Sequence, residues 1–493
     1  MIEKKVALIK TSKCYYPIEN NFRPSIAFPE YPFIELSKTE NHVYEMIREG
    51  FRMMGYDIEN YGSVNWNPLG DLIKPGDKVL IKPNMVMDKN RNVSGNTDCL
   101  YTQPSLVAAV IDYVIIALKG YGSIIVGDAP VQECNFKNLI KMSGYEDLIE
   151  YYRKKLYDSQ IIIELHDFRG LFSKTINGIN HTSVRDVSST TIDLAEESEF
   201  SDQSAKYFEK MRITNYDPAL LKKHHNQNKH EYLINDNVLI ADVVINMPKP
   251  KTHRKAGVTI SLKNIVGINT RKEYLPHHVI GSIEEGGDEY QEKSILKEIR
   301  DKLLDKRNYY AQTAKRYNTA KFFAHTAGII NRTIKFENKD DYLDGSWYGN
   351  DTISKTIIDL NKILFYSDKM GVLQEKKQRK YLIIADMIIS GEKEGPLAPL
   401  PKDVGIIAIG EDPVCFDEVI LKLMGAKKEY IHTIEHARNV VGNYILTEGD
   451  SYPYLLSNKK EWNKKKIEEI SDDSLLYFVP TSGWKEAFYC VNE

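Results

Sequence analysis

The sequence predicts an α/β protein: a mostly parallel sheet core with helices on both faces, interrupted by a mixed α/β insertion and a helical insertion. Two observations support this fold class. The apolar runs "KKVALIKT", "GDKVLIKPN" and "SIIVGDAP" have the pattern of core strands. Between them, "ENHVYEMIREGFRMMG" and "TQPSLVAAVIDYVIIALKGYG" place apolar residues at helical spacing. Strands and helices that alternate over this length form parallel sheets with right-handed crossovers.

Proline and threonine residues mark the limits of these elements. Pro83 ends the second strand, because a proline restricts the residue before it and donates no ladder hydrogen bond. Thr102 and Pro104 open the second helix, where a missing N–H costs nothing. The core pattern returns later with "NDNVLIADVVINMPK", "TISKTIIDLNKILFY", "RKYLIIADMIISG", "DVGIIAIGED" and "DPVCFDEVILKLMGA".

Changes of composition divide the chain, whose 493 residues exceed what one core needs. The segments we expect are 1–150, the first part of the α/β core; 151–235, a mixed insertion rich in Asn, His, Tyr and Ser; 236–287, a core strand with a cationic segment; 288–345, a helical insertion or lid; 346–448, the second part of the core; and 449–493, a polar C-terminal tail on the surface.

The bulk properties exclude several classes of protein. A formal net charge of −3 gives no global attraction to nucleic acid or to an anionic membrane. The longest apolar run carries Asp112 and Lys119 and breaks at glycines, so we expect no membrane span. The N-terminus lacks the apolar region of a signal peptide, so we expect a cytoplasmic protein. Five scattered cysteines without a Cys-x-x-Cys pair argue against disulfides, zinc ribbons and an iron–sulfur cluster within this chain.

Polar side chains follow five predicted strands at their carboxyl ends, where open parallel sheets bind ligands. We therefore predict one shared cleft. Its residues would be Lys82 and Asn84; Asp128; Asn246, Lys249, Lys251 and His253; Glu392 and Glu394; and Glu411 and Asp412. Asp412 also precedes Pro413 in the pattern of a helix N-cap.

The segment 246–269, "NMPKPKTHRKAGVTISLKNIVGIN", concentrates positive charge directly after a core strand. Burying an unpaired ammonium costs several kcal/mol. Lys263, inside an apolar stretch, therefore needs a carboxylate such as Asp128 or Glu394, a bound anion, or access to water. We predict an anion-binding site whose substrate-binding residues are Lys82, Asn84, Lys249, Lys251, Lys263 and Asn264.

Glycines bracket this segment, and its histidine is the best candidate for proton chemistry. Gly257 and Gly267 would let the backbone approach a ligand closely. His253 titrates near physiological pH in its unperturbed state, which suits an acid or base. Nearby cations should lower its pKa and favour the neutral imidazole. Asp128 and Glu394 are the other candidate catalytic groups, since they could balance the lysines or exchange protons.

Standard nucleophile, phosphate-loop and dinucleotide motifs are missing from the sequence. Two cofactor hypotheses stay open. Mg²⁺ could be held by Asp128 with Glu392 or Glu394, because hard cations take carboxylate oxygens. A flavin or nucleotide could instead place its phosphate in the cationic pocket.

Several motifs together resemble the family called domain of unknown function 362: "VLIKPNMV", "TQPSLVAAVIDYV", "GDAP", "INMPKPKTH…GVTISLKNIVG", "GEKEGPLAP" and "GEDPVCFDEVILKLMG". The resemblance implies an α/β core and a site built from the Lys-Pro-Asn, Lys-x-His, Lys-Asn and Gly-Glu-x-x-Gly-Pro segments. Some members of that family carry a ferredoxin-like iron–sulfur module, which implies redox work. The cysteines of this chain do not supply that module, although a redox partner could deliver electrons.

Three functions are consistent with these observations. The leading one is an enzyme that acts on a small anionic substrate, bearing phosphate or carboxylate, in a cleft lined by Lys, His, Asp and Glu. The second is an oxidoreductase with a bound organic cofactor or an external redox partner. The third is a non-catalytic protein that binds an anionic ligand.

Overall fold

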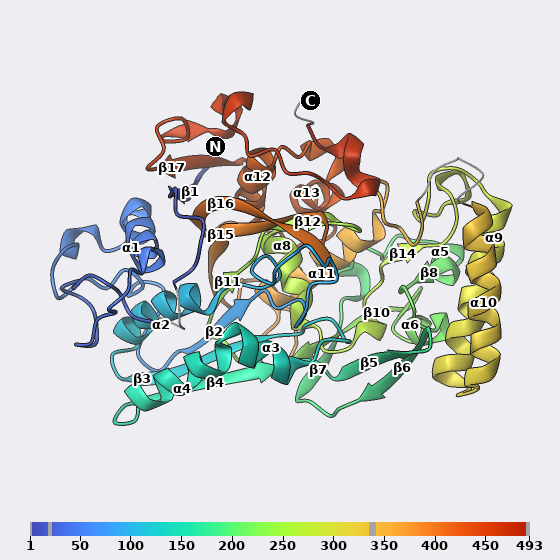
Figure 1. Ribbon diagram of the computed structural model, residues 1–493, viewed down its shortest axis with the longest axis horizontal. Helices are drawn as coiled ribbons and strands as arrows, with labels where there is room; N and C mark the ends of the chain where they lie inside the picture. Colours follow the sequence, from blue (N-terminus) through green and yellow to red (C-terminus); the bar gives the residue numbers. More distant parts are fainter. Residues whose placement is uncertain (1, 18–21, 335–341, 490–493) are drawn as a thin grey trace.

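The computed structural model describes residues 2–17, 22–334 and 342–489. An eleven-stranded sheet runs through the molecule in the order β18-β17-β1-β16-β15-β11-β2-β3-β4, with β12 and β13 attached beside β15 (Figure 1). The strands are β1 (Ile2–Lys10), β2 (Lys78–Pro83), β3 (Tyr121–Asp128), β4 (Gln160–Asp167), β11 (Val243–Met247), β12 (Lys251–His253), β13 (Gly257–Thr259), β15 (Lys380–Glu394), β16 (Ala398–Gly410), β17 (Ser451–Ser457) and β18 (Lys465–Lys466). The pairs from β15 through β11, β2 and β3 to β4 are parallel, whereas β16 is antiparallel to both β15 and β1. The predicted α/β class with a mostly parallel sheet is confirmed.

Alternate residues along the core strands face two separate helical layers. Val79 and Ile81 of β2 pack in one hydrophobic cluster with α1, α2 and α4, while Leu80 packs in the other with α8, α11 and α12. This alternation follows from the two-residue period of a strand. The helices of the first layer are α1 (His42–Met54), α2 (Pro104–Leu118) and α4 (Tyr145–Lys155); those of the second are α8 (Ser261–Asn264), α11 (Thr352–Tyr366), α12 (Pro413–Met424) and α13 (His432–Arg438).

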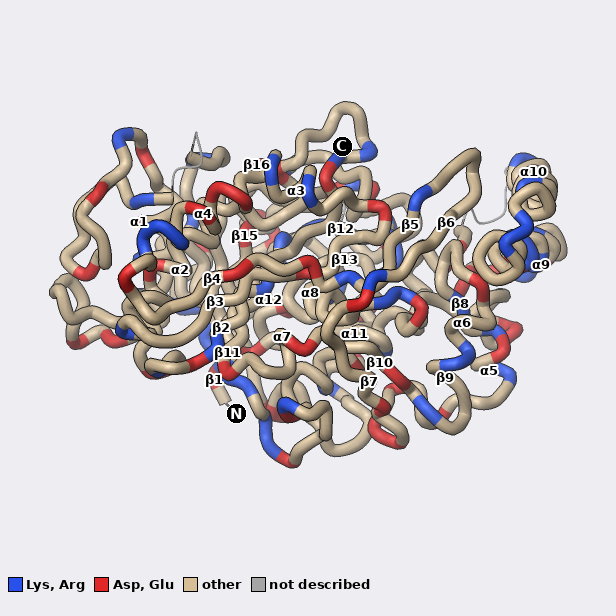
Figure 2. The backbone as a smooth tube through the Cα atoms, turned by 90° about the horizontal axis from the view of Figure 1, so that it is seen from below, with Lys and Arg blue, Asp and Glu red and all other residues tan. Residues whose placement is uncertain are grey.

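Smaller elements extend the molecule to one side of the main sheet. The hairpin of β5 (Leu171–Ile176) and β6 (Ile179–Val184) packs against the helical segment of α9 (Ile295–Asn308) and α10 (Tyr317–Ile334). Figures 1 and 2 both show α9 and α10 at the edge of the molecule. The other elements there are α5 (Ala205–Lys210), α6 (Pro218–Lys222), β7 (Ser189–Asp193), β8 (Met211–Arg212), β9 (His225–Asn226), β10 (Lys229–Asn235) and β14 (His278–Val279). By contrast, α7 (Asp236–Leu239) packs in the hydrophobic cluster of α8, α11 and α12, and α3 (Phe136–Ser143) packs against α4.

Two segments that we expected outside the core contribute strands to the main sheet. β4 lies within 151–235 and pairs with β3, so the core continues past residue 151. β17 lies within the expected tail 449–493 and pairs with β1. Trp462 and Trp484 of that tail are fully buried. The buried face of β17 includes the polar residues Ser451 and Ser457, so the strand lacks the apolar alternation of a core strand. For this reason the sequence predicts a surface tail here.

The state of the cysteines and the length of the helices bear on the expectations about disulfides and membrane spans. Cys14, Cys99, Cys134 and Cys415 are free thiols, while Cys490 lies outside the described residues. In the described ranges, no helix combines the length and apolarity needed to cross a bilayer.

Candidate functional site

The first predicted site residues form a closed ion pair where β2 and β3 end. The Nζ of Lys82 lies 2.7 Å from Oδ1 of Asp128, and both side chains are buried. Asp128 also accepts hydrogen bonds from the backbone N–H groups of Met85 at 2.6 Å and Ala129 at 2.9 Å. Burial raises the pKa of Asp128 and lowers that of Lys82, while their mutual attraction opposes both shifts. Both members of this pair are therefore bonded to each other and to neighbouring backbone groups.

The predicted glycines allow close packing within the protein. The backbone of Gly267 crosses the Lys82–Asp128 pair and its carbonyl accepts the N–H of Ala129 at 3.0 Å. A Cβ at Gly267 would overlap Oδ1 of Asp128. Gly257 has a φ of +72°, and a Cβ there would lie 2.6 Å from the ring of Trp484.

A chain of amides connects three of the strand ends. Lys251 donates to Oδ1 of Asn84 at 2.7 Å and to the carbonyl of Leu100 at 2.8 Å. Asn84 donates to Asn264 at 2.9 Å, and Asn264 donates to Asn246 at 2.7 Å. Burial lowers the pKa of Lys251 to about 7. The structure brings these predicted site residues together, and they hydrogen-bond to one another.

Lys249 belongs to a third buried group, two of whose members we did not single out from the sequence. Its Nζ lies 3.0 Å from Oδ2 of Asp386, and both side chains are fully buried. The hydroxyl of Tyr16 accepts a hydrogen bond from Lys249 and donates to Oδ1 of Asp386 at 2.6 Å. Asp386 interrupts the apolar run "YLIIADMIISG", and a carboxylate inside a core strand needs a partner. That signal could have identified it.

Lys263 differs from these lysines because its charge is not paired. Within the described residues its ammonium makes no hydrogen bond or ion pair, and the side chain is partly exposed. Burial, reinforced by the charges of Lys82 and Lys272, lowers its pKa to about 8. Asp417 of α12 fixes its position, since that buried carboxylate accepts the N–H groups of Ser261 at 2.9 Å and Leu262 at 3.1 Å at the start of α8.

Further cations surround Lys263. Lys272 was not among the predicted site residues. It is also partly exposed and makes no ion pair or hydrogen bond in the described part of the chain. Burial lowers its pKa to about 8. Lys255 donates to the carbonyl of Asp344, and Arg254 donates to the hydroxyl of Ser346 at 3.1 Å. Lys and Arg positions gather beside β13 and α8 in Figure 2. We call Lys263, Lys272, Lys255 and Arg254 the cationic cluster.

His253 ends β12 beside the cationic cluster. Its Nδ1 accepts the backbone N–H groups of Lys255 at 3.1 Å and Ala256 at 3.2 Å. Because Nδ1 accepts, the ring is neutral and carries its hydrogen on Nε2. Burial lowers the pKa of His253 well below its usual value, and the charge of Lys263 lowers it further. The expected neutral imidazole is therefore present.

The two glutamates of "GEKEGP" do not join this group. Glu392 lies 3.1 Å from Nζ of Lys402 and accepts the N–H of Val479 at 3.0 Å. Glu394 is exposed and accepts the N–H of Ser482 at 2.9 Å. They bind the C-terminal segment because β15 continues well past the end of its neighbour β11. In the described chain, no ion pair or hydrogen bond links either glutamate to Lys263 or to Asp128.

Glu411 and Asp412 lie at the opposite end of the strands, beside the amino end of β15. β16 is antiparallel to β15, so its carboxyl end is far from the carboxyl ends of the parallel strands. Asp412 accepts the N–H groups of Val414 and Cys415, both at 3.0 Å, and thus caps α12 as its sequence pattern predicts.

Comparison with protein families supports the resemblance seen in the sequence. The family described as "Domain of unknown function (DUF362)" matches residues 79–164 and 173–422, more than half of the chain. These ranges contain the buried lysine pairs, the amide chain, His253 and the cationic cluster. No curated protein and no solved structure matches the chain. The chain belongs to the DUF362 family.

Proposed function

We propose that this protein is an enzyme acting on a small anionic substrate, bearing phosphate or carboxylate, that binds at the cationic cluster beside His253. The observation that carries the proposal is the pair of ammonium groups of Lys263 and Lys272. Both are partly exposed, and neither has a carboxylate partner among the described residues.

The electrostatics favour an anion with more than one negative charge. Desolvated cations repel one another, and this repulsion contributes to the lowered pKa of Lys263 and of His253. Lys255 and Arg254 add two charges that are bonded only to neutral oxygens. A bound phosphate or dicarboxylate would relieve the repulsion and would gain charge-assisted hydrogen bonds.

The neutral ring of His253 can donate one hydrogen bond, from Nε2–H. Its Nδ1 is fixed by two backbone N–H groups, so Nε2–H is the group it can offer to a substrate oxygen. The surrounding cations stabilise negative charge that develops on that oxygen. We assign His253 the role of hydrogen-bond donor to it, with the cationic cluster holding the substrate.

Measuring ligand affinity and turnover separately distinguishes an enzyme from a protein that only binds the anion. Phosphorylated and carboxylated metabolites would first be screened by thermal shift, and binders would be incubated with the protein and analysed for conversion by mass spectrometry. We expect His253→Gln to keep affinity within about threefold and to lose about 10²-fold or more in turnover. Lys263→Gln should lose affinity. Matched controls are Lys321→Gln and His325→Gln, at exposed positions on α10.

Two other outcomes would reject parts of the proposal. If the wild type binds an anion, Lys263→Gln abolishes binding and no binder is converted, the protein is a binding protein. If both site variants behave like their α10 controls, the site is wrongly assigned.

A further inference from the structure

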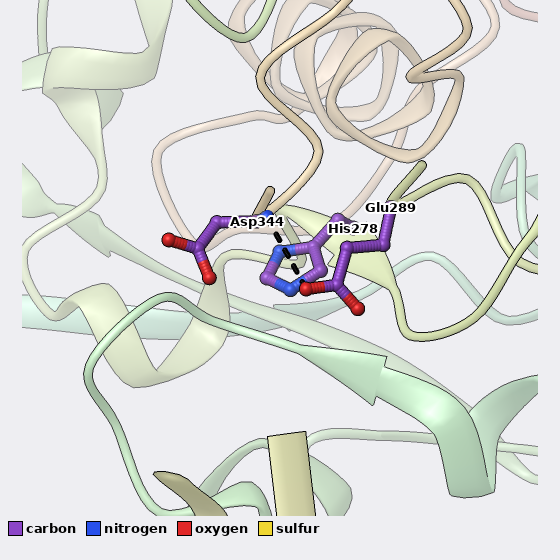
Figure 3. A group of neighbouring side chains, drawn as sticks. All are labelled: His278, Glu289 and Asp344. Atoms are coloured by element: carbon purple, nitrogen blue, oxygen red, sulfur yellow. Dashed lines mark hydrogen bonds between the residues drawn. The ribbon is translucent and has the colours of Figure 1, made fainter. Parts of the chain in front are cut away.

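A second group of ionisable side chains lies next to the cationic cluster. His278, Glu289 and Asp344 each offer one ligand atom, and these atoms lie within 4.8 Å of one another (Figure 3). They come from β14, from the loop before α9 and from the loop before α11, so the fold brings together three separate segments. Lys255 connects this group to the cationic cluster by donating to the carbonyl of Asp344.

The imidazole of His278 makes no hydrogen bond within the described part of the chain. His278 is 3% exposed, and its Nδ1 is buried without a hydrogen bond. Nε2 also makes none to the described residues. Figure 3 shows the ring between the side chains of Asp344 and Glu289. A buried polar group without a partner costs about 1–3 kcal/mol, so an unpaired imidazole at this position needs an explanation.

The carboxylates share one guanidinium as their direct cationic partner. Arg300 of α9 reaches Glu289 at 3.4 Å, Asp301 at 2.8 Å and Asp344 at 3.0 Å. Lys255 is close to Asp344, but it bonds to the backbone carbonyl and not to the carboxylate. Glu289 also accepts the backbone N–H groups of Asp344 at 3.2 Å and of Gly281 at 3.4 Å. Because each carboxylate oxygen has two lone pairs, Glu289 and Asp344 keep acceptor capacity for another cation.

The space available fits one ion. A cavity of about 30 Å³ is lined by His278, Glu289, Asp301 and Asp344 among other residues. One water molecule occupies a similar share of liquid volume, and a divalent ion with a single water or substrate ligand needs little more. Arg212 and Arg307 also line the cavity, but they bond to Asp305 and to the amides of Asn215 and Asn308.

We propose that His278, Glu289 and Asp344 bind one divalent transition-metal ion. One imidazole nitrogen with two carboxylate oxygens suits Zn²⁺, Mn²⁺ or Fe²⁺, whereas Mg²⁺ and Ca²⁺ prefer oxygen ligands alone. Three protein ligands leave a coordination position open, as in catalytic metal sites. This site stands on its own observations, and its failure would leave the anion-binding proposal unchanged.

The test uses the full chain, stripped of metal with a chelator and dialysed. Zn²⁺, Mn²⁺ and Co²⁺ would be titrated by calorimetry, with the visible spectrum of Co²⁺ reporting nitrogen and oxygen coordination. We expect the wild type to bind one equivalent, and His278→Gln and Glu289→Gln each to weaken binding by about 100-fold or more. His325→Gln, at an exposed position on α10, should bind like the wild type.

Folding of each variant would be checked by circular dichroism and thermal unfolding. Two ligand variants are used so that the test still works if one of them fails to fold. Arg300→Gln adds a decisive comparison. If the wild type binds no metal while Arg300→Gln does, the carboxylates serve only to hold the arginine and the proposal is overturned. Stoichiometric binding that both ligand variants retain would overturn it as well.

Discussion

Two sets of lysines near the carboxyl ends of the parallel strands differ in whether their ammonium groups are paired within the protein. The inner set, Lys82, Lys249 and Lys251, is fully buried, and each ammonium is bonded to a carboxylate or to amide oxygens. The outer set, Lys263 and Lys272, is partly exposed and makes no ion pair or hydrogen bond in the described chain. The difference separates two groups that look alike in the sequence: the inner lysines are paired within the protein, whereas the outer lysines carry the charge that we propose a ligand compensates.

The largest expected effect comes from breaking an inner pair. Lys82→Met leaves the carboxylate of Asp128 buried and unpaired, so we expect the free energy of unfolding to fall by about 3–5 kcal/mol. Urea denaturation followed by circular dichroism measures this loss. The double variant Lys82→Met/Asp128→Asn should recover much of it, because the neutral side chain keeps an acceptor for the backbone N–H groups of Met85 and Ala129. A single variant as stable as the wild type would show that the pair is not closed.

Anion affinity should fall at high pH because the outer lysines lose their charge. The pKa values of Lys263 and Lys272 are lowered to about 8, so both are charged below pH 8 and both must bind a proton with the anion above it. Each lysine then contributes up to about tenfold per pH unit, or about 100-fold for the two. Sulfate is the best probe, since it stays a dianion throughout. Constant affinity between pH 7 and pH 10 would contradict the assignment.

Removing an outer charge should not destabilise the protein. The pKa of Lys263 is lowered from 10.5 to about 8, so the unfolded state binds more protons between these values and the charged lysine opposes folding below them. Lys263→Gln should keep or raise the free energy of unfolding, by up to about 2 kcal/mol after solvent screening is considered. A loss comparable to that of Lys82→Met, measured under the same conditions, would place Lys263 with the inner set.

The smallest effect is expected at Glu394. Its side chain is exposed and accepts one backbone hydrogen bond from Ser482. Glu394→Gln should cost at most about 1 kcal/mol of stability and leave anion affinity unchanged. Calorimetry on this variant therefore tests the sequence-based hypothesis that Glu394 is catalytic; a large loss of affinity or turnover would restore it.

The sequence predicts the fold better than the site because strand and helix periods are local signals. The alternation of buried residues in β2 and the helical spacing in α2 are readable from a few residues. The direction of β16 is not, since it depends on a turn after Glu394 that sends the chain back antiparallel to β15. That reversal places Glu411 and Asp412 at the amino ends of the parallel strands, away from the other predicted site residues.

For the site, the sequence identifies which segments meet but not which charges pair. The predicted neighbours Asn84, Lys251 and Asn264 do form one network. The pairing of Lys249 with Asp386 joins residues 137 positions apart and is set by the register of β11 and β15. Lys272 could not be selected because nothing in its local sequence shows that the chain returns it to Lys263.

Anion binding by the outer lysines can be measured by titrating sulfate into four proteins at pH 7 with calorimetry: the wild type, Lys263→Gln, Lys272→Gln and the control Lys321→Gln. We expect stoichiometric binding to the wild type and the control, weakened by about tenfold or more in each outer-lysine variant, since a hydrogen bond to a charged group contributes about 1.5–3 kcal/mol. Equal affinity in all four proteins, or no binding to the wild type of sulfate or of any phosphate or dicarboxylate tested in its place, would contradict this expectation.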